Sequence, residues 1–269
     1  MPSTARALMV GATLCVPFGD VTDSALQLGD VTRWRAVARR PIYFGHQSVG
    51  EDITAGLAAL NDELDLGLRI VLTRVPSAIS HPAFVHFHAG RNQDPASKNA
   101  DLLKILAARP RPDHPLVLLK YCYVDVDHST NVAAMFASYM AMVETIRARY
   151  PDVTIIHATV PLTTVETPVK ARVKQLLGRH TAREDAIARQ RYNALIRVAF
   201  AGREPLFDIA RVEAARAGGG RATYAFGDQQ IEILAEENTR DGGHLNPHGQ
   251  KIVARELLNL LAKTIEGGA

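Results

Sequence analysis

Short apolar or β-branched runs alternate with longer stretches of helical periodicity along most of this chain. This alternation constrains the fold more than any other feature, because it is typical of βαβ units and of a parallel sheet covered by helices on both faces. We expect strands at residues 42–44, 69–73, 116–121, 153–158 and 205–209, and helices at 51–60, 100–108, 131–150, 184–200 and 247–265. The chain is therefore predicted to be an α/β protein.

Two stretches, 163–180 and 210–240, fit neither pattern well, and we expect them to be excursions at the ends of strands. In doubly wound sheets the carboxyl ends of the strands are where ligands bind, so such excursions would shape a substrate site.

Size and composition favour one globular domain over residues 26–269. The chain has 269 residues, of which 47% are hydrophobic and 22% charged, which is ordinary for a protein with a packed core. The net charge of +3 is small and the arginines are scattered, so no nucleic-acid partner is expected. Two cysteines cannot build a disulfide framework, and no zinc-type Cys/His spacing is present.

The first 25 residues resemble a secretory signal peptide. Arg6 precedes an apolar run over residues 7–18, which is too short for the roughly 20 residues of a spanning helix. We therefore expect a periplasmic or secreted protein with no stable membrane insertion. The alternative is a disordered N-terminus on a cytoplasmic protein, which the single charge and Pro17 favour.

Ser48 lies between the first predicted strand and the first predicted helix, with Gly45 and Gly50 on either side. Glycines permit a tight turn there, and such a turn exposes the hydroxyl as a nucleophile. The free N–H groups of the following helix suit the oxyanion of a tetrahedral intermediate. The plainer alternative is that Ser48 only caps the helix.

A second group stands just before the last helix, where the sequence reads Asp241-Gly242-Gly243-His244. The glycines let the carboxylate turn back toward the imidazole. With Ser48 these residues would complete a triad of nucleophile, base and orienting carboxylate, as ester hydrolysis by serine requires. The alternative is an Asx-turn at Asp241 and a capping role for His244.

These two groups give the chain its resemblance to the SGNH (GDSL-like) hydrolases over residues 42–262. Gly45 to Gly50 stand where the Gly-Asp-Ser block of that family would stand, and Asp241 to His244 match its last block. The resemblance implies a flavodoxin-like, three-layer α/β/α sandwich with a central parallel sheet of about five strands. It also implies catalysis through an acyl-enzyme, with no metal and no cofactor.

The match to that family has departures. Two residues, His46 and Gln47, separate Gly45 from Ser48 where the family has one, and the asparagine of the third block is missing from residues 120–125. By resemblance, Gly90 corresponds to the oxyanion glycine of the second block and Asp125 to the aspartate after the missing asparagine. The oxyanion would then be bound at Ser48 and Gly90, with the side-chain donor sought among Asn92, Gln47 and Tyr121.

Other polar residues near these blocks are candidates for substrate contact, and we expect them to be His46, Gln47, Tyr121 and Asp125. His46 has the equal alternative of a buried imidazole bonded to a backbone carbonyl. His81, His86 and His88 follow the second predicted strand, but no carboxylate stands beside them at ligand spacing. We therefore expect a loop lining the substrate site there and no metal.

The sequence is best interpreted as a serine esterase, a hydrolase acting on ester bonds. The expected partner is a small-molecule or carbohydrate ester, and family analogy suggests acetyl or other short acyl groups on carbohydrate or cell-envelope polymers. Two alternatives stay open: a non-catalytic glycan-binding module on the same fold, and an O-acyltransferase using the same triad. Nothing in the sequence indicates an oligomeric state.

Overall fold

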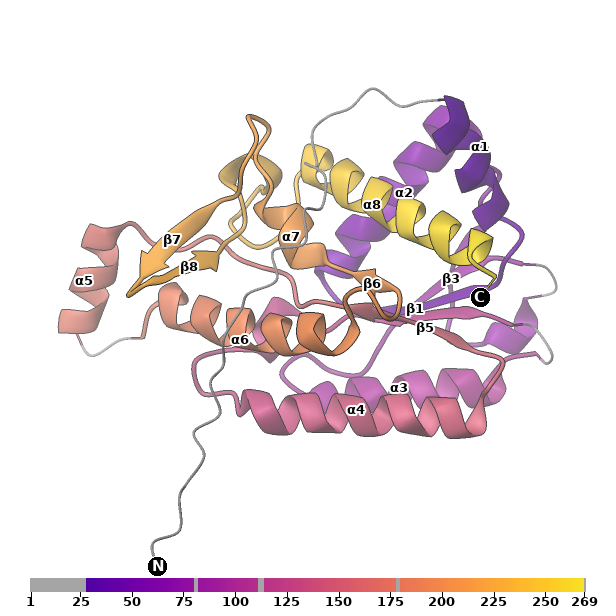
Figure 1. Cartoon of the computed structure of the whole chain (residues 1–269), viewed down its shortest axis with the longest axis horizontal. Coiled ribbons are helices and arrows are strands. Elements are labelled where there is room, and N and C mark those ends of the chain that lie inside the picture. The colour runs from indigo at the N-terminus through magenta and orange to yellow at the C-terminus, as the bar shows by residue number, and fades with distance from the viewer. Residues whose placement is uncertain (1–27, 80–81, 111–113, 178–179, 269) are drawn as a thin grey trace, which may run out of the picture.

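Six parallel strands form the central sheet in the order β2-β3-β1-β4-β5-β6 (Figure 1). The computed structural model describes residues 28–79, 82–110, 114–177 and 180–268, so the predicted signal segment at 1–25 lies outside the described residues. The strands are β1 (Ile42–His46), β2 (Ile70–Leu72), β3 (Phe84–His88), β4 (Leu116–Leu119), β5 (Thr154–Ala158) and β6 (Leu206–Phe207).

The strand order confirms the predicted α/β class. Without the short edge strand β2, the remaining five strands follow the flavodoxin-like order in which the first strand lies between the second and third. The prediction of about five strands missed β3, because its histidines were taken for a loop. The strand is covered on both faces, since its first four residues are all buried, with Phe84 in one core and Phe87 in the other, and only His88 at its end is exposed.

Helices cover both faces of the sheet, which makes the three-layer sandwich. One face carries α1 (Leu28–Val37), α2 (Val49–Leu64), α7 (Ile209–Ala214) and α8 (Pro247–Glu266), and the other carries α3 (Pro95–Ala108), α4 (Val132–Arg149) and α6 (Ala182–Phe200). Successive strand residues point to opposite faces, so Phe44 of β1 packs in the first core and Tyr43 in the second.

The two stretches that fitted no pattern contain regular structure of their own. Residues 163–180 include α5 (Pro168–Leu176), and residues 210–240 hold most of α7 and a hairpin of β7 (Thr223–Phe226) and β8 (Gln229–Glu232). Both α5 and the hairpin lie at one end of the sandwich, on the left in Figure 1. The expectation of excursions is right in position, but the segments are more ordered than predicted.

The helix starts follow local capping chemistry. α3 begins at Pro95, five residues earlier than predicted, because the Asp94 side chain accepts a hydrogen bond from the Ser97 N–H and proline suits the first turn. α8 begins at Pro247 as predicted, with Asn246 as its cap. Helix α1 was not predicted.

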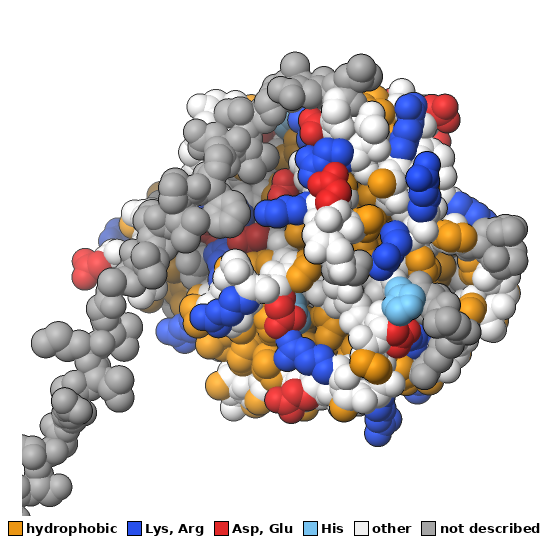
Figure 2. Space-filling model, turned by 45° about the vertical axis from the view of Figure 1, so that its right-hand side comes forward, with side chains coloured by type: hydrophobic (Ala, Val, Ile, Leu, Met, Phe, Trp, Pro, Cys, Tyr) orange, Lys and Arg blue, Asp and Glu red, His pale blue; other side chains and the backbone are white. Residues whose placement is uncertain are grey.

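The outer surface is chemically mixed. On the face drawn in Figure 2, Lys and Arg side chains lie among Asp, Glu and uncharged groups. None of the helices in the described part of the chain has the length and hydropathy needed to cross a bilayer.

Candidate active site

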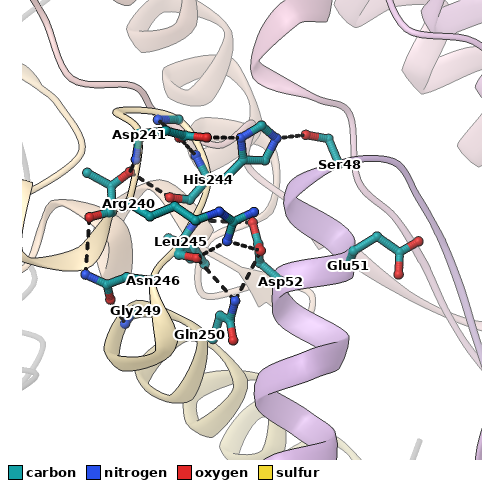
Figure 3. Close-up of polar contacts among 12 residues, drawn as sticks. Ser48, Glu51, Asp52, Arg240, Asp241, His244, Leu245, Asn246, Gly249 and Gln250 are labelled. Atoms are coloured by element: carbon teal, nitrogen blue, oxygen red, sulfur yellow. Dashed lines mark hydrogen bonds and ion pairs between the residues drawn. The ribbon is translucent and has the colours of Figure 1, made fainter.

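Ser48, His244 and Asp241 meet at the carboxyl end of β1, although Ser48 and His244 are far apart in the sequence (Figure 3). Ser48 Oγ lies 2.7 Å from His244 Nε2, and His244 Nδ1 lies 2.8 Å from Asp241 Oδ2. With a proton on Nδ1 shared with Asp241, Nε2 is free to accept the serine proton. The three side chains have the connectivity of a serine-hydrolase triad.

The backbone at Ser48 is held in an unusual conformation. Its φ of 52° lies in the left-handed region, which costs a residue with a side chain on the order of 1–3 kcal/mol. The carbonyl of the preceding residue, Gln47, is held in place because it accepts hydrogen bonds from Lys120 Nζ at 2.8 Å and Cys122 Sγ at 3.3 Å. No side-chain cap bond is formed by Ser48, so the capping alternative does not describe it.

The side chain of Gln47, expected to contact substrate, instead bonds to the backbone. Its amide donates to the carbonyls of Ala89 at 3.3 Å and Gly90 at 3.0 Å. Gln47 therefore links the turn that carries Ser48 to the turn that follows β3.

The loop that carries His244 is ordered by its own carboxylate. Asp241 Oδ1 accepts hydrogen bonds from the N–H groups of Gly243 at 3.0 Å and His244 at 2.7 Å. These bonds, that of His244 first, lower the pKa of Asp241 to about 2. Asp241 is therefore ionised at neutral pH, as the orienting carboxylate of a triad must be.

A buried carboxylate, which no sequence pattern indicated, connects this loop to α2. Asp52 accepts hydrogen bonds from Arg240 at 2.8 Å, from the N–H of Leu245 at 3.1 Å and from Gln250 at 3.2 Å (Figure 3). Since Asp52 lies one helical turn after Ser48, these contacts fix His244 relative to the nucleophile.

Tyr123 is a second residue of the site outside the predicted set, because strand alternation left open whether Tyr121 or Tyr123 would face the site. Its side chain lies near that of Ser48, its ring meets that of His244 edge-on with centroids 6.0 Å apart, and Arg189 lies over it at 5.8 Å. A Cβ on Gly243 would be 3.0 Å from the hydroxyl, so glycine there leaves room for it. Burial and the charge of Asp241 raise the pKa of Tyr123, so the phenol keeps its proton.

Two of the predicted oxyanion donors, Gly90 and Asn92, already form hydrogen bonds within the protein. The Gly90 N–H donates to Asp101 Oδ2 at 2.7 Å, so it is already engaged, which corrects its expected role. Asn92 Oδ1 accepts from Lys98 Nζ at 3.1 Å. Among the described residues nothing accepts a hydrogen bond from the Ser48 backbone N–H, which leaves that donor available.

Three of the residues expected to touch substrate are buried instead. His46 is fully buried, Tyr121 donates to Asn99 at 2.5 Å inside the core, and Asp125 pairs with Lys98 with both side chains at 0% exposure. Tyr121 and Asp125 satisfy their polar atoms within the protein, whereas the buried Nδ1 of His46 has no hydrogen-bond partner among the described residues. His46 is buried as its alternative expected, but its Nε2 pairs with His86 Nδ1 at 3.0 Å, so the expected bond to a backbone carbonyl is wrong.

A histidine cluster lies on the other side of the Ser48 turn. His86 of β3 places Nδ1 3.0 Å from His46 Nε2, and burial, the largest cause, lowers the pKa of His46 to about 2 and also that of His86. Contrary to expectation a carboxylate does stand beside them, because the first turn of α2 brings Glu51 to this cluster and into contact with His88. His81 lies outside the described residues.

Known proteins resemble this chain in structure only. No protein-family model and no curated protein sequence matches it. Among the solved structures that match are a lipolytic protein provisionally assigned to the G-D-S-L family of Desulfitobacterium hafniense (13% identity, 82% of this chain and 99% of that one, TM-score 0.45) and a periplasmic lipopolysaccharide acetyltransferase domain of Salmonella ser. Paratyphi A (12%, 90% and 90%, 0.45).

Another match is a Streptococcus pneumonia protein provisionally described as a platelet activating factor (15% identity, 87% of this chain and 91% of that one, TM-score 0.47). At these identities and TM-scores the matches carry no functional argument, and the function has to be inferred from the chain's own geometry.

Proposed function

We propose that this protein is a serine esterase that works through an acyl-enzyme on Ser48. The observation that carries the proposal is the continuous chain of hydrogen bonds from Ser48 Oγ through His244 to Asp241, at 2.7 and 2.8 Å. Both distances lie within the reach that nucleophile and base need for proton transfer.

In the first half-reaction Ser48 Oγ attacks the acyl carbonyl and its proton passes to His244 Nε2. Asp241 stabilises the imidazolium through Nδ1 and stays ionised. The tetrahedral intermediate then collapses, the ester bond to the alcohol breaks, and His244 returns the proton to the departing oxygen. A water molecule repeats the sequence on the acyl-enzyme and releases the acid.

Two donors are suited to the oxyanion. The Ser48 backbone N–H, at the start of α2, has no partner among the described residues, and the Tyr123 hydroxyl lies against the Ser48 side chain. We infer that Tyr123 takes the place of the asparagine missing from the third block. An N–H at a helix start and a phenol that keeps its proton both donate to developing negative charge.

The substrate class follows from the resemblance to the SGNH hydrolases. It implies acetyl or other short acyl groups on carbohydrate or cell-envelope polymers, which an exported enzyme would encounter. An O-acyltransferase would share every step up to the acyl-enzyme. Product analysis with and without an added sugar acceptor separates hydrolysis from transfer.

The test is hydrolysis of a short-chain aryl ester by the wild type, Ser48→Ala and, as a matched control, Ser129→Ala at an exposed serine. We expect turnover by the wild type and the control, and loss of about 10⁶-fold in kcat for Ser48→Ala. Equal turnover by Ser48→Ala would remove Ser48 from the mechanism. No turnover by any of the three proteins, on any acyl ester tried, would favour the non-catalytic glycan-binding alternative.

A further inference from the structure

Three segments bring metal-binding side chains together on the side of the Ser48 turn away from the triad. His46 ends β1, His86 lies on β3, and Glu51 lies in the first turn of α2. One ligand atom from each lies within 4.8 Å of the others. These residues, called here the His46 cluster, have no role in the esterase chemistry above.

The spacing in the His46 cluster fits a tetrahedral ion. His46 Nε2 and His86 Nδ1 are 3.0 Å apart, and two nitrogens bound to one zinc ion at about 2.0–2.1 Å would be separated by roughly 3.3 Å. Without an ion only one of these nitrogens can donate to the other. With an ion both would direct their lone pairs at it, and a small outward shift would be enough.

The cluster has a buried wall and an open side. His46 and His86 are buried with 0% and 7% of their surface exposed, whereas the side chains of Glu51 and His88 are 46% and 51% exposed. An ion could therefore enter from solvent past Glu51. His88 contacts the Glu51 carboxylate, which is the arrangement of an outer partner that orients a ligand.

We propose that His46, His86 and Glu51 bind one divalent transition-metal ion of the zinc class, with His88 orienting the Glu51 carboxylate. Two imidazoles and one carboxylate are a ligand set that zinc accepts, and they do not suit Mg²⁺ or Ca²⁺, which prefer oxygen ligands. In Figure 3 the Glu51 side chain points away from Ser48 and His244, so the ion would brace the nucleophile turn without touching the reacting atoms. This site does not depend on the proposed esterase activity.

A second group of potential ligands sets the design of the test. His128, His180 and Asp185 also lie within ligand distance of one another, but both histidines are exposed and the group joins two surface segments. Zinc bound there would obscure binding at the His46 cluster. The substitution His180→Gln, far from Ser48 in the chain, removes a ligand from this second group and leaves the His46 cluster as the complete group among the described residues.

The experiment is calorimetric titration of Zn²⁺ into the full chain after dialysis against a chelator, in the His180→Gln background. We expect one equivalent to bind and to raise the Tm, and no binding of Mg²⁺. X-ray absorption of the loaded protein should show nitrogen and oxygen neighbours at about 2.0–2.1 Å. No bound equivalent would overturn the proposal.

Three variants in that background locate the ion. His86→Gln should abolish binding, and Glu51→Gln should do the same at an exposed position where folding is not at risk. His88→Gln should weaken affinity by about 10- to 100-fold as an outer partner does. Circular dichroism of each metal-free variant establishes that it is folded. Full binding by folded Glu51→Gln, at wild-type affinity, would also overturn the assignment.

Discussion

Asp241 and Glu213 are both carboxylates, but their surroundings shift their pKa values in opposite directions. Asp241 lies on an exposed loop, where two backbone N–H groups lower its pKa to about 2. Glu213 is fully buried on α7, and burial raises its pKa to about 8 despite a hydrogen bond from the Leu162 N–H at 2.6 Å. Local hydrogen bonds thus stabilise the charged form of Asp241, whereas burial favours the neutral form of Glu213.

Two regions of the molecule differ in the same way, one ordered by local hydrogen bonds and the other by burial. In the triad loop, residues 241–244, Asp241 is exposed and His244 half-buried, and the loop takes its shape from hydrogen bonds between near neighbours. The buried charge cluster reaches the Ser48 turn through Lys120 Nζ, which donates to Gln47 O, and its ion pair joins Lys98 to Asp125, 27 positions away in the sequence. Its members are Lys98, Lys120, Asp125 and Glu213. We infer that the loop supplies the chemistry while the cluster fixes the turn, so substitutions in the two regions should affect different measurements.

The largest effect expected in this comparison is on the triad loop. Asp241→Asn should lower kcat for an aryl ester by about 10⁴-fold, because the amide favours the wrong imidazole tautomer. Its stability should change little, since the side chain is exposed. Steady-state kinetics measure the loss, with Asp228→Asn at another exposed position as the control. A loss below tenfold would mean that Asp241 does not orient His244.

In the buried charge cluster the effect should be on stability. Lys98→Met leaves the Asp125 carboxylate buried without its cation, which should lower the free energy of unfolding by about 3–5 kcal/mol. Urea denaturation measures this change. Lys104→Met, at a lysine side chain that is 76% exposed, is the control. Equal stabilities for the two variants would show that the buried pair does not hold the fold.

Tyr123 could belong to either region, because its hydroxyl could act in catalysis or only in structure. Tyr123→Phe keeps the ring beside His244 but removes the hydroxyl, so kcat should fall by about 100- to 1000-fold with little change in KM. Tyr224→Phe, whose hydroxyl bonds to Arg183 O elsewhere, is the matched control. If kcat is unchanged while the Tm falls, the hydroxyl has a structural role only.

The last effect concerns pH and Glu213, and it is the smallest at any one step of pH. The folded protein holds a proton on Glu213 that the unfolded chain releases above its ordinary pKa of 4.5, so stability should fall as pH rises from about 4.5 to about 8. The slope from this group is at most about 1.4 kcal/mol per pH unit. Glu213→Gln should flatten that part of the profile, as denaturation at several pH values would measure. An unaltered slope would place the titration on another group.

The comparison also explains what the sequence could predict. The chain positions of Ser48, Asp241 and His244 were readable because strand, glycine turn and helix follow one another locally at each of them. The pairings of Asp52 with Arg240, and of Glu51 with the histidines of β1 and β3, join segments whose meeting depends on the sheet order. That order was predicted without β3.

Tyr121 and Tyr123 show that prediction from sequence also fails between residues close together in the chain. Strand alternation alone could not decide which of them faces the site, because the chain leaves the strand after Leu119 and turns into a short 3-10 helix at Tyr123. The turn directs Tyr123 to Ser48 and leaves Tyr121 in the core. Residues at a strand end thus depend on the turn that follows.

In the proposed mechanism His244 activates Ser48, and covalent labelling reports that activation at the serine itself. The wild type, Ser48→Ala and His244→Gln are each treated with a fluorophosphonate probe, and the modified peptide is identified by mass spectrometry. We predict one label on Ser48 in the wild type, none in Ser48→Ala and a rate lower by several orders of magnitude in His244→Gln. A wild type that stays unlabelled, or that labels equally well without His244, would contradict the account.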